Sequence, residues 1–169
     1  MVEQLDTILP GIFAGASVAY LWLAVRVSRA SAEASGNSVS YFLLLIGTMT
    51  AGSAFAYNAT DPNIYGIGRT LTFFSAGFLP VVLYNIYREY TVGKAPRLLV
   101  LLLSVIPVIS TVLAMTNDLH NMIWSVVEID GEIRFTEPDE HPWFKRVHAP
   151  FAYGLFGFSL IAMAGRLPT

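Results

Sequence analysis

Five long apolar stretches, separated by polar segments, dominate the pattern of this chain. None alternates polar and apolar residues as a barrel strand does, and each comes close to the roughly 20 residues that a helix needs to cross a bilayer. They predict helices over residues 7–27, 39–57, 68–88, 97–121 and 147–165. Because unpaired backbone amides cannot face lipid, we expect an all-α integral membrane bundle of five transmembrane helices, a single domain over residues 1–169.

The loop between the fourth and fifth predicted helices is the longest of the chain and contains a second pattern. Segments 125–129 and 132–135, rich in apolar residues, flank the pair Asp130-Gly131. Asp-Gly favours a type I′ turn, because that turn needs a positive φ at both central positions. We therefore expect a small β-hairpin that lies over the outer mouth of the bundle.

Small residues mark faces on which helices can approach closely in lipid. Gly11 and Gly15 form a GxxxG pair in the first predicted helix, and residues 51–54 form a smooth patch in the second. Small residues are also common in membrane helices generally, so ordinary composition stays an alternative explanation.

The composition supports a membrane protein. Charged residues make up only 13% of the chain and hydrophobic residues 54%, whereas a soluble domain carries about 25% charged residues. With a formal net charge of −2 and no basic patch, the chain has no sign of nucleic-acid binding. It contains no cysteine, which excludes disulfides, thiolate metal sites and a cysteine nucleophile.

The distribution of charge predicts the orientation, because Lys and Arg accumulate in cytoplasmic loops. With the N-terminus outside, the inner segments hold six basic residues and two carboxylates, and the outer segments hold four basic residues and ten carboxylates. We therefore expect a multi-pass protein of the cell membrane with its N-terminus outside. Since the number of spans is odd, its C-terminus would lie in the cytoplasm.

The segment after the fourth apolar stretch holds unusual polar residues. If the fourth helix continues, Thr116, His120 and Trp124 follow one another at intervals of four, and Asn117 lies one turn before His120. Residues at this spacing share one helix face. A polar face at the end of a membrane helix must look into the bundle or into water.

The other end of the same loop brings three more residues to the start of the fifth helix. We predict that both groups converge on one outward-facing ligand pocket, formed by Asn117, His120, Trp124, Trp143, Phe144 and His148. For any single residue the alternative is a structural role. Tryptophan commonly anchors helices at the membrane interface, and a residue such as Asp118 or Asn121 can cap a helix.

These residues resemble a known family. The order Thr-Asn-x-x-His-x-x-x-Trp, a hairpin-like insertion and then Trp-Phe-x-x-x-His is similar to the N-terminal seven-transmembrane sensor region of bacterial and archaeal histidine kinases, which also precedes diguanylate cyclase domains. The resemblance covers the whole chain and is most specific over residues 116–153. It implies a receptor with its N-terminus outside and a small-molecule site at the outer helices and loop. The matching residues are Asn117, His120, Trp124, Phe144 and His148.

The chain departs from the family pattern after the fifth helix. Family members continue with two further helices and a cytoplasmic output domain. These 169 residues contain no kinase histidine motif, no ATP-binding glycine motif and no cyclase signature. The chain is expected to be either part of a longer receptor or a stand-alone five-helix relative.

The leading hypothesis is a membrane sensory module that binds an unknown small ligand outside and signals to a cytoplasmic output domain or partner. It needs the lipid bilayer and no cofactor, and a homodimer is one option for its assembly. The alternatives are a haem- or metal-binding subunit of a larger complex, with His120 and His148 as ligands, and a pure assembly subunit. An enzyme is not expected, because the chain has no HExxH, GxSxG or phosphate-binding loop.

Overall fold

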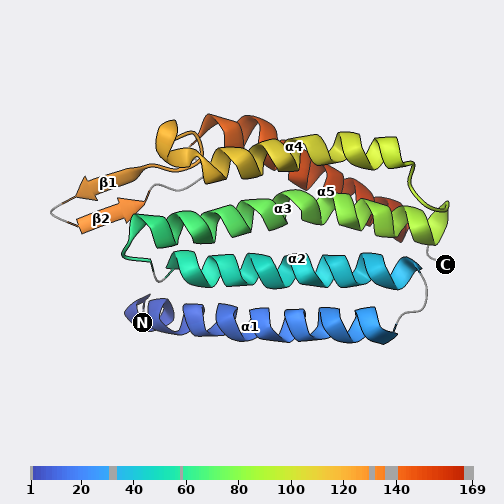
Figure 1. Ribbon diagram of the computed structural model, residues 1–169, viewed down its shortest axis with the longest axis horizontal. Coiled ribbons are helices and arrows are strands. Elements are labelled where there is room, and N and C mark those ends of the chain that lie inside the picture. Colours follow the sequence, from blue (N-terminus) through green and yellow to red (C-terminus); the bar gives the residue numbers. More distant parts are fainter. Residues whose placement is uncertain (1, 31–33, 58, 130–131, 136–140, 166–169) are drawn as a thin grey trace.

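The computed structural model describes residues 2–30, 34–57, 59–129, 132–135 and 141–165. Neighbouring helices in the chain run antiparallel along the long axis of the molecule, and the two termini lie at opposite ends (Figure 1). The long helices are α1 (Val2–Ala30), α2 (Ala34–Tyr57), α3 (Pro62–Thr91), α4 (Arg97–Met115) and α5 (Ala149–Ala164).

Five helices in this part of the chain are long and apolar enough to cross a membrane, as the apolar stretches predict. Large apolar side chains cover their outer faces; on α4, for example, Leu98 and Leu101 are 69% and 66% exposed. Such exposure would be unusual for a water-soluble domain but suits contact with lipid. The candidate spans are Ile8–Ala30, Asn37–Tyr57, Pro62–Thr91, Arg97–Met115 and Phe144–Ala164.

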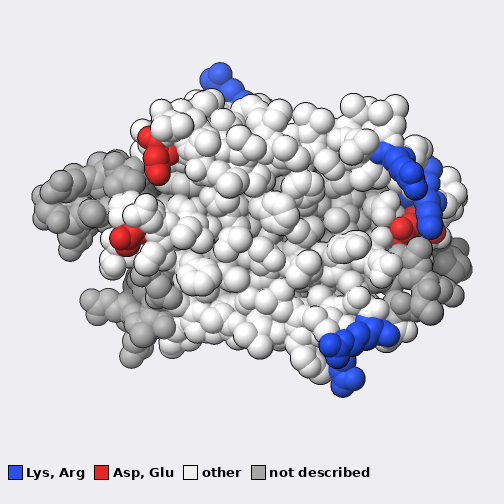
Figure 2. Space-filling model, in the orientation of Figure 1, with Lys and Arg blue, Asp and Glu red and all other residues white. Residues whose placement is uncertain are grey.

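Charged side chains gather toward the two ends of the bundle, and most of the surface between them is uncharged on the face that Figure 2 shows. Acidic side chains mark the end at which the hairpin lies, which we call the hairpin end. Basic side chains gather toward the opposite end, which we call the basic end, where an acidic side chain also lies; a further basic group lies on the upper edge, nearer the hairpin end. The basic residues of the basic end are Arg26, Arg29, Arg88, Lys94 and Arg97.

Helix α3 is the centre of the bundle. It packs against α2, α4 and α5, whereas α1 packs against α2. At the α2–α3 crossing a Cβ atom on Gly68 would lie 2.6 Å from the backbone of both Gly52 and Ala56, so the crossing requires glycine. The smooth patch in α2 is therefore a real packing face. Gly11 and Gly15, in contrast, have no neighbour among the described residues within 4 Å of an added Cβ.

The loop after α4 contains the two expected strands. β1 (Val126–Ile129) and β2 (Glu132–Phe135) pair antiparallel, with Val126 opposite Phe135 and Ile129 opposite Glu132. The predicted turn residues, 130 and 131, lie outside the described residues. The hairpin extends along the long axis past the ends of α2 and α3 (Figure 1). That it covers the mouth of the bundle stays a prediction.

The predicted continuation of the fourth helix to residue 121 is also wrong. α4 ends at Met115, a short 3₁₀-helix η1 (Asn117–Leu119) follows, and Asn121 has a φ of 50°. A positive φ ends a right-handed helix, and the Asn117 side chain competes for the backbone of the next turn. Trp124 consequently does not follow His120 on a helix face.

Before α5 the chain forms a five-residue π-helix, η3 (Phe144–His148), in which the Ala149 N–H donates to the Phe144 carbonyl. Such π-turns within helices are rare and often occur at functional sites. The fifth helical stretch therefore begins near residue 144, three residues before the predicted start.

Candidate functional site

The buried core near the hairpin end joins α3, α4 and the loop that follows α4. Ile123 is 0% and Trp124 2% exposed, so both are as buried as any helix residue of the bundle. Trp143 and Phe144 pack against this core from the other side of the loop. The buried members of the cluster are Tyr65, Phe73, Ala114, Ile123 and Trp124.

Asn117 holds the turn that places Trp124. Its side chain is 2% exposed, its Oδ1 accepts from the N–H groups of Ile123 (3.0 Å) and Trp124 (3.3 Å), and its Nδ2 donates to the Trp124 carbonyl (2.9 Å). These bonds pair backbone N–H and carbonyl groups that lie outside the helices and strands and would otherwise be buried without a partner. In this geometry Asn117 is a scaffold residue.

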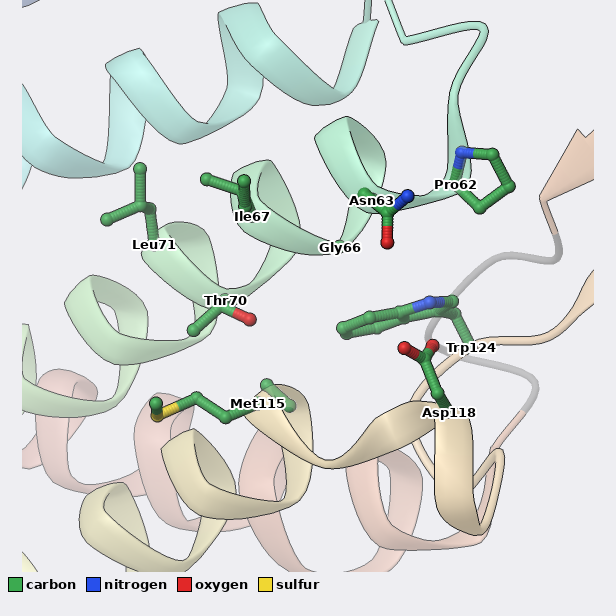
Figure 3. A pocket seen from close by; sticks show the side chains of 10 residues that line it. Pro62, Asn63, Gly66, Ile67, Thr70, Leu71, Met115, Asp118 and Trp124 are labelled. Carbon is green, nitrogen blue, oxygen red and sulfur yellow. The ribbon is translucent and has the colours of Figure 1, made fainter.

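Trp124 closes one side of a cavity of about 390 Å³ near the ends of α3 and α4. Its ring meets Tyr65 edge-on, with centroids 5.9 Å apart and an interplanar angle of 80°. Figure 3 shows the indole reaching between Asn63 above and the Asp118 carboxylate below. We call this cavity the hairpin-end pocket.

The polar groups of the hairpin-end pocket come from α3 and from η1. Asn63 and Thr70 on α3 and Asp118 in η1 supply an amide, a hydroxyl and a carboxylate, and Gly66 leaves space beside Trp124 (Figure 3). A Cβ on Gly66 would lie 3.7 Å from Trp124 Cζ2, which is ordinary contact. The sequence pattern missed Asn63 and Gly66, because the first turns of α3 lie before residue 68, where we expected that helix to begin. Thr70 lies within the expected helix, but no signal in the sequence marks it as a pocket residue.

His120 is half-buried and uses both ring nitrogens within its own turn. Nδ1 accepts from the Met122 N–H at 3.0 Å, and Nε2 lies 3.2 Å from Thr116 Oγ1, which donates to the Val112 carbonyl at 2.8 Å. Because Nδ1 is an acceptor, the proton of the neutral ring sits on Nε2. His120 does not line the hairpin-end pocket.

The residues at the start of α5 form a separate polar network. Ser110, fully buried on α4, lies 3.0 Å from Trp143 Nε1, which donates to it, and 2.9 Å from His148 Nδ1. His148 is 2% exposed; its ring stacks on Phe144 with centroids 5.6 Å apart and lies 5.0 Å from the ring of Phe73. Burial of these polar groups is tolerable because they bond to one another.

Comparison with known proteins identifies the family of the chain. A family model described as the N-terminal 7TM region of histidine kinase matches residues 7–168. The chain belongs to this family. The match agrees with the resemblance seen in the sequence, and it makes this 7TM region a sensor region rather than a catalytic domain. No curated protein and no solved structure gave a significant match.

Three of the six predicted site residues line a cavity, and these three divide between two cavities, whereas Asn117, His120 and Trp143 line neither. Trp124 lines the hairpin-end pocket, whereas Phe144 and His148 line a second cavity of about 330 Å³. Phe73 lies between them, since it belongs to the core of Trp124 and touches both Phe144 and His148. That these residues bind a ligand stays a prediction.

The contacts lend no support to His120 and His148 as a haem or metal pair. Both nitrogens of His120 and Nδ1 of His148 already have hydrogen-bond partners. In the part of the chain that the structure describes, no three His, Asp or Glu side chains group as metal ligands.

Proposed function

We propose that this chain is a membrane sensory module that binds a small ligand in the hairpin-end pocket and signals to a cytoplasmic output domain or partner protein. The observation that carries the proposal is the pocket itself. Its volume of about 390 Å³ lies within the range of about 300–1,000 Å³ that is usual for small-molecule sites. It combines an indole with a carboxylate, an amide and a hydroxyl (Figure 3).

The chemistry of the wall suits a small amphipathic ligand. Asp118 and Asn63 are exposed, so a ligand would reach them from water, and the exposed Ile67 offers apolar surface beside them. Trp124 is buried and forms the wall behind these residues. A carboxylate next to an indole favours a ligand with hydrogen-bond donors or a positive charge. We therefore expect a water-soluble amine or amide rather than a free anion.

Helix α3 is the element that would carry the signal. The pocket is built on its first turns, and the helix continues through the bundle to Arg88 at the basic end. A ligand shifts a conformational equilibrium only if it binds two states with different affinity. Because α3 packs against α2, α4 and α5, a small movement at its pocket would change the packing of three helices.

The proposed orientation places the hairpin end outside and the basic end in the cytoplasm, in accord with the positive-inside rule. The chain has no cysteine, so single-cysteine variants can test this directly. Thr60 and Val92 are exposed, near opposite ends of α3. Thr60→Cys should react with a membrane-impermeant maleimide in intact cells, and Val92→Cys should react only after lysis. The reverse pattern would contradict the proposal.

Ligand binding can be tested by filling the pocket. Purified protein would be screened by thermal shift against small water-soluble amines, amides and amino acids. For a compound that binds, Gly66→Leu should weaken binding at least about tenfold, because the added side chain occupies the space beside Trp124. The matched control is Gly154→Leu in α5, where an added Cβ has no neighbour within 4 Å. Compounds that bind equally well to parent and Gly66→Leu proteins would contradict this site.

A further inference from the structure

A second cavity, of about 330 Å³, lies between α2, α3 and α5, and we call it the α3/α5 pocket. Among the described residues, its wall has no Lys, Arg, Asp or Glu. Tyr153 stands at its rim and is 73% exposed, within the candidate span Phe144–Ala164. The pocket therefore opens on the apolar side of the bundle, where a lipid-soluble molecule would enter.

His148 supplies a hydrogen-bond donor to this pocket. Ser110 Oγ accepts from the Trp143 N–H, and His148 Nδ1 is the one acceptor for the Ser110 hydroxyl among the described residues, so we infer that the hydroxyl donates to Nδ1. The neutral ring then carries its proton on Nε2. Nε2 has no hydrogen-bond partner in the described part of the chain.

Among the described residues, the buried side-chain atoms without a partner are Ser75 Oγ, Arg88 Nε and Glu89 Oε2, and His148 Nε2 is not one of them. His148 lines the pocket, so an acceptor atom of a ligand there would give its Nε2–H a hydrogen bond. A backbone acceptor is also present in the wall. Pro80 has no N–H, so the Ala76 carbonyl lacks the helical donor that residue 80 would otherwise supply, and both residues line the pocket.

The other residues that line the α3/α5 pocket indicate which class of ligand it suits. Phe144, Tyr153 and Phe156 offer aromatic surface against which a flat ring can pack. No basic side chain lies among the described residues of the wall to neutralise a carboxylate or a phosphate, and an unpaired anion is costly in an apolar pocket. An ionised fatty acid or a phospholipid head group is therefore excluded, whereas a neutral ring carbonyl fits.

We propose that the α3/α5 pocket binds a membrane-soluble quinone, with a ring carbonyl accepting a hydrogen bond from His148 Nε2. This site is distinct from the hairpin-end pocket, and it does not depend on the function proposed for that pocket.

The test is a titration of the purified chain, in phosphatidylcholine nanodiscs, with decylubiquinone. Quenching of tryptophan emission reports binding, because Trp143 belongs to the same hydrogen-bond network as His148. The parent protein should show a saturable quenching component. His148→Phe keeps an aromatic ring but removes the donor, and should weaken binding roughly tenfold.

Two further variants fill the pocket from opposite walls. Ala152→Leu on α5 and Ala76→Leu on α3 should each remove the saturable component, and either one that keeps the parent's far-UV circular dichroism is sufficient. Gly154→Leu, which adds the same side chain to α5 outside the pocket, should bind as the parent does.

Three results would overturn the proposal. Quenching of the parent that rises without saturation means that no site exists. Saturable binding that is unchanged in His148→Phe and in the folded pocket-filling variant places the quinone elsewhere. Displacement of the quinone by an equal concentration of dioctanoylglycerol, which carries ester carbonyls but no ring, would assign the pocket to a lipid.

Discussion

The two cavities on α3 are built from the same helix but from different chemistry. The hairpin-end pocket exposes Asp118 and Asn63 to solvent, whereas the α3/α5 pocket has no charged residue in its described wall and ties His148 to Ser110. The surrounding solvent accounts for the difference. Near the helix ends water can stabilise a carboxylate, while within a membrane span a polar group needs a partner inside the protein.

A carboxylate placed in each pocket is the strongest test of this difference. Ala152→Asp puts it at a site that is 8% exposed, and we expect the free energy of unfolding to fall by about 4 kcal/mol, as for other uncompensated buried charges. Asn63→Asp puts it at an exposed site in the first turn of α3, where the helix dipole favours it. That change should stay within about 1 kcal/mol. Thermal unfolding in detergent would measure both, and equal losses would contradict the comparison.

A substitution in the turn that holds Trp124 should lower the free energy of unfolding nearly as much as Ala152→Asp does. Asn117→Ala leaves the N–H groups of Ile123 and Trp124 without their acceptor, and we expect a loss of about 3 kcal/mol in the free energy of unfolding. The control is Asn37→Ala, at an exposed position in α2. The interpretation of Asn117 as a scaffold residue fails if the two variants unfold at the same temperature.

Loss of the hydrogen-bond network beside the α3/α5 pocket should lower the free energy of unfolding somewhat less than loss of the Asn117 bonds. Ser110→Ala leaves Trp143 Nε1 and His148 Nδ1 unpaired, for an expected loss of about 2 kcal/mol. Ser104→Ala, on the same helix, removes a hydroxyl whose one partner among the described residues is the Val100 carbonyl, and should cost less than about 0.5 kcal/mol. If urea or thermal unfolding gave the same stability for Ser110→Ala and Ser104→Ala, that result would argue against the network.

The smallest expected effect concerns His120. His120→Ala removes the acceptor of the Met122 N–H, and we expect a loss of about 1 kcal/mol, since this turn is partly exposed. A compound that binds the hairpin-end pocket should keep its affinity within about twofold in a thermal-shift titration, because His120 does not line that pocket. Abolished binding would instead favour His120 as a ligand contact.

Much of the fold was predictable because its signals are local. The length of an apolar run shows by itself that a helix can cross the bilayer, and the five spans follow from that. The alternating residues around 130 and 131 likewise predicted β1 and β2. The family was recognisable from the spacing of a few residues after α4 and before α5, and the match over residues 7–168 agrees.

The candidate site was less predictable because it depends on contacts between distant residues. Asn63 and Thr70 of α3 contribute polar groups to the hairpin-end pocket, but no pattern in the sequence marks them as neighbours of Trp124. Gly11 and Gly15 match a packing motif but meet no neighbour in the part of the chain that the structure describes, whereas Gly68 matches none and is essential for the α2–α3 crossing.

The sequence alone therefore determined a membrane bundle, its number of spans and its family, since each depends on hydrophobicity and spacing along the chain. Only the tertiary structure decided what the polar residues do. Asn117 ends the helical course of α4 because its side chain bonds to backbone groups six and seven residues away. Trp124 and His148 then face different cavities on α3, because the rotation of each helix and the course of the loop fix which side chains can meet.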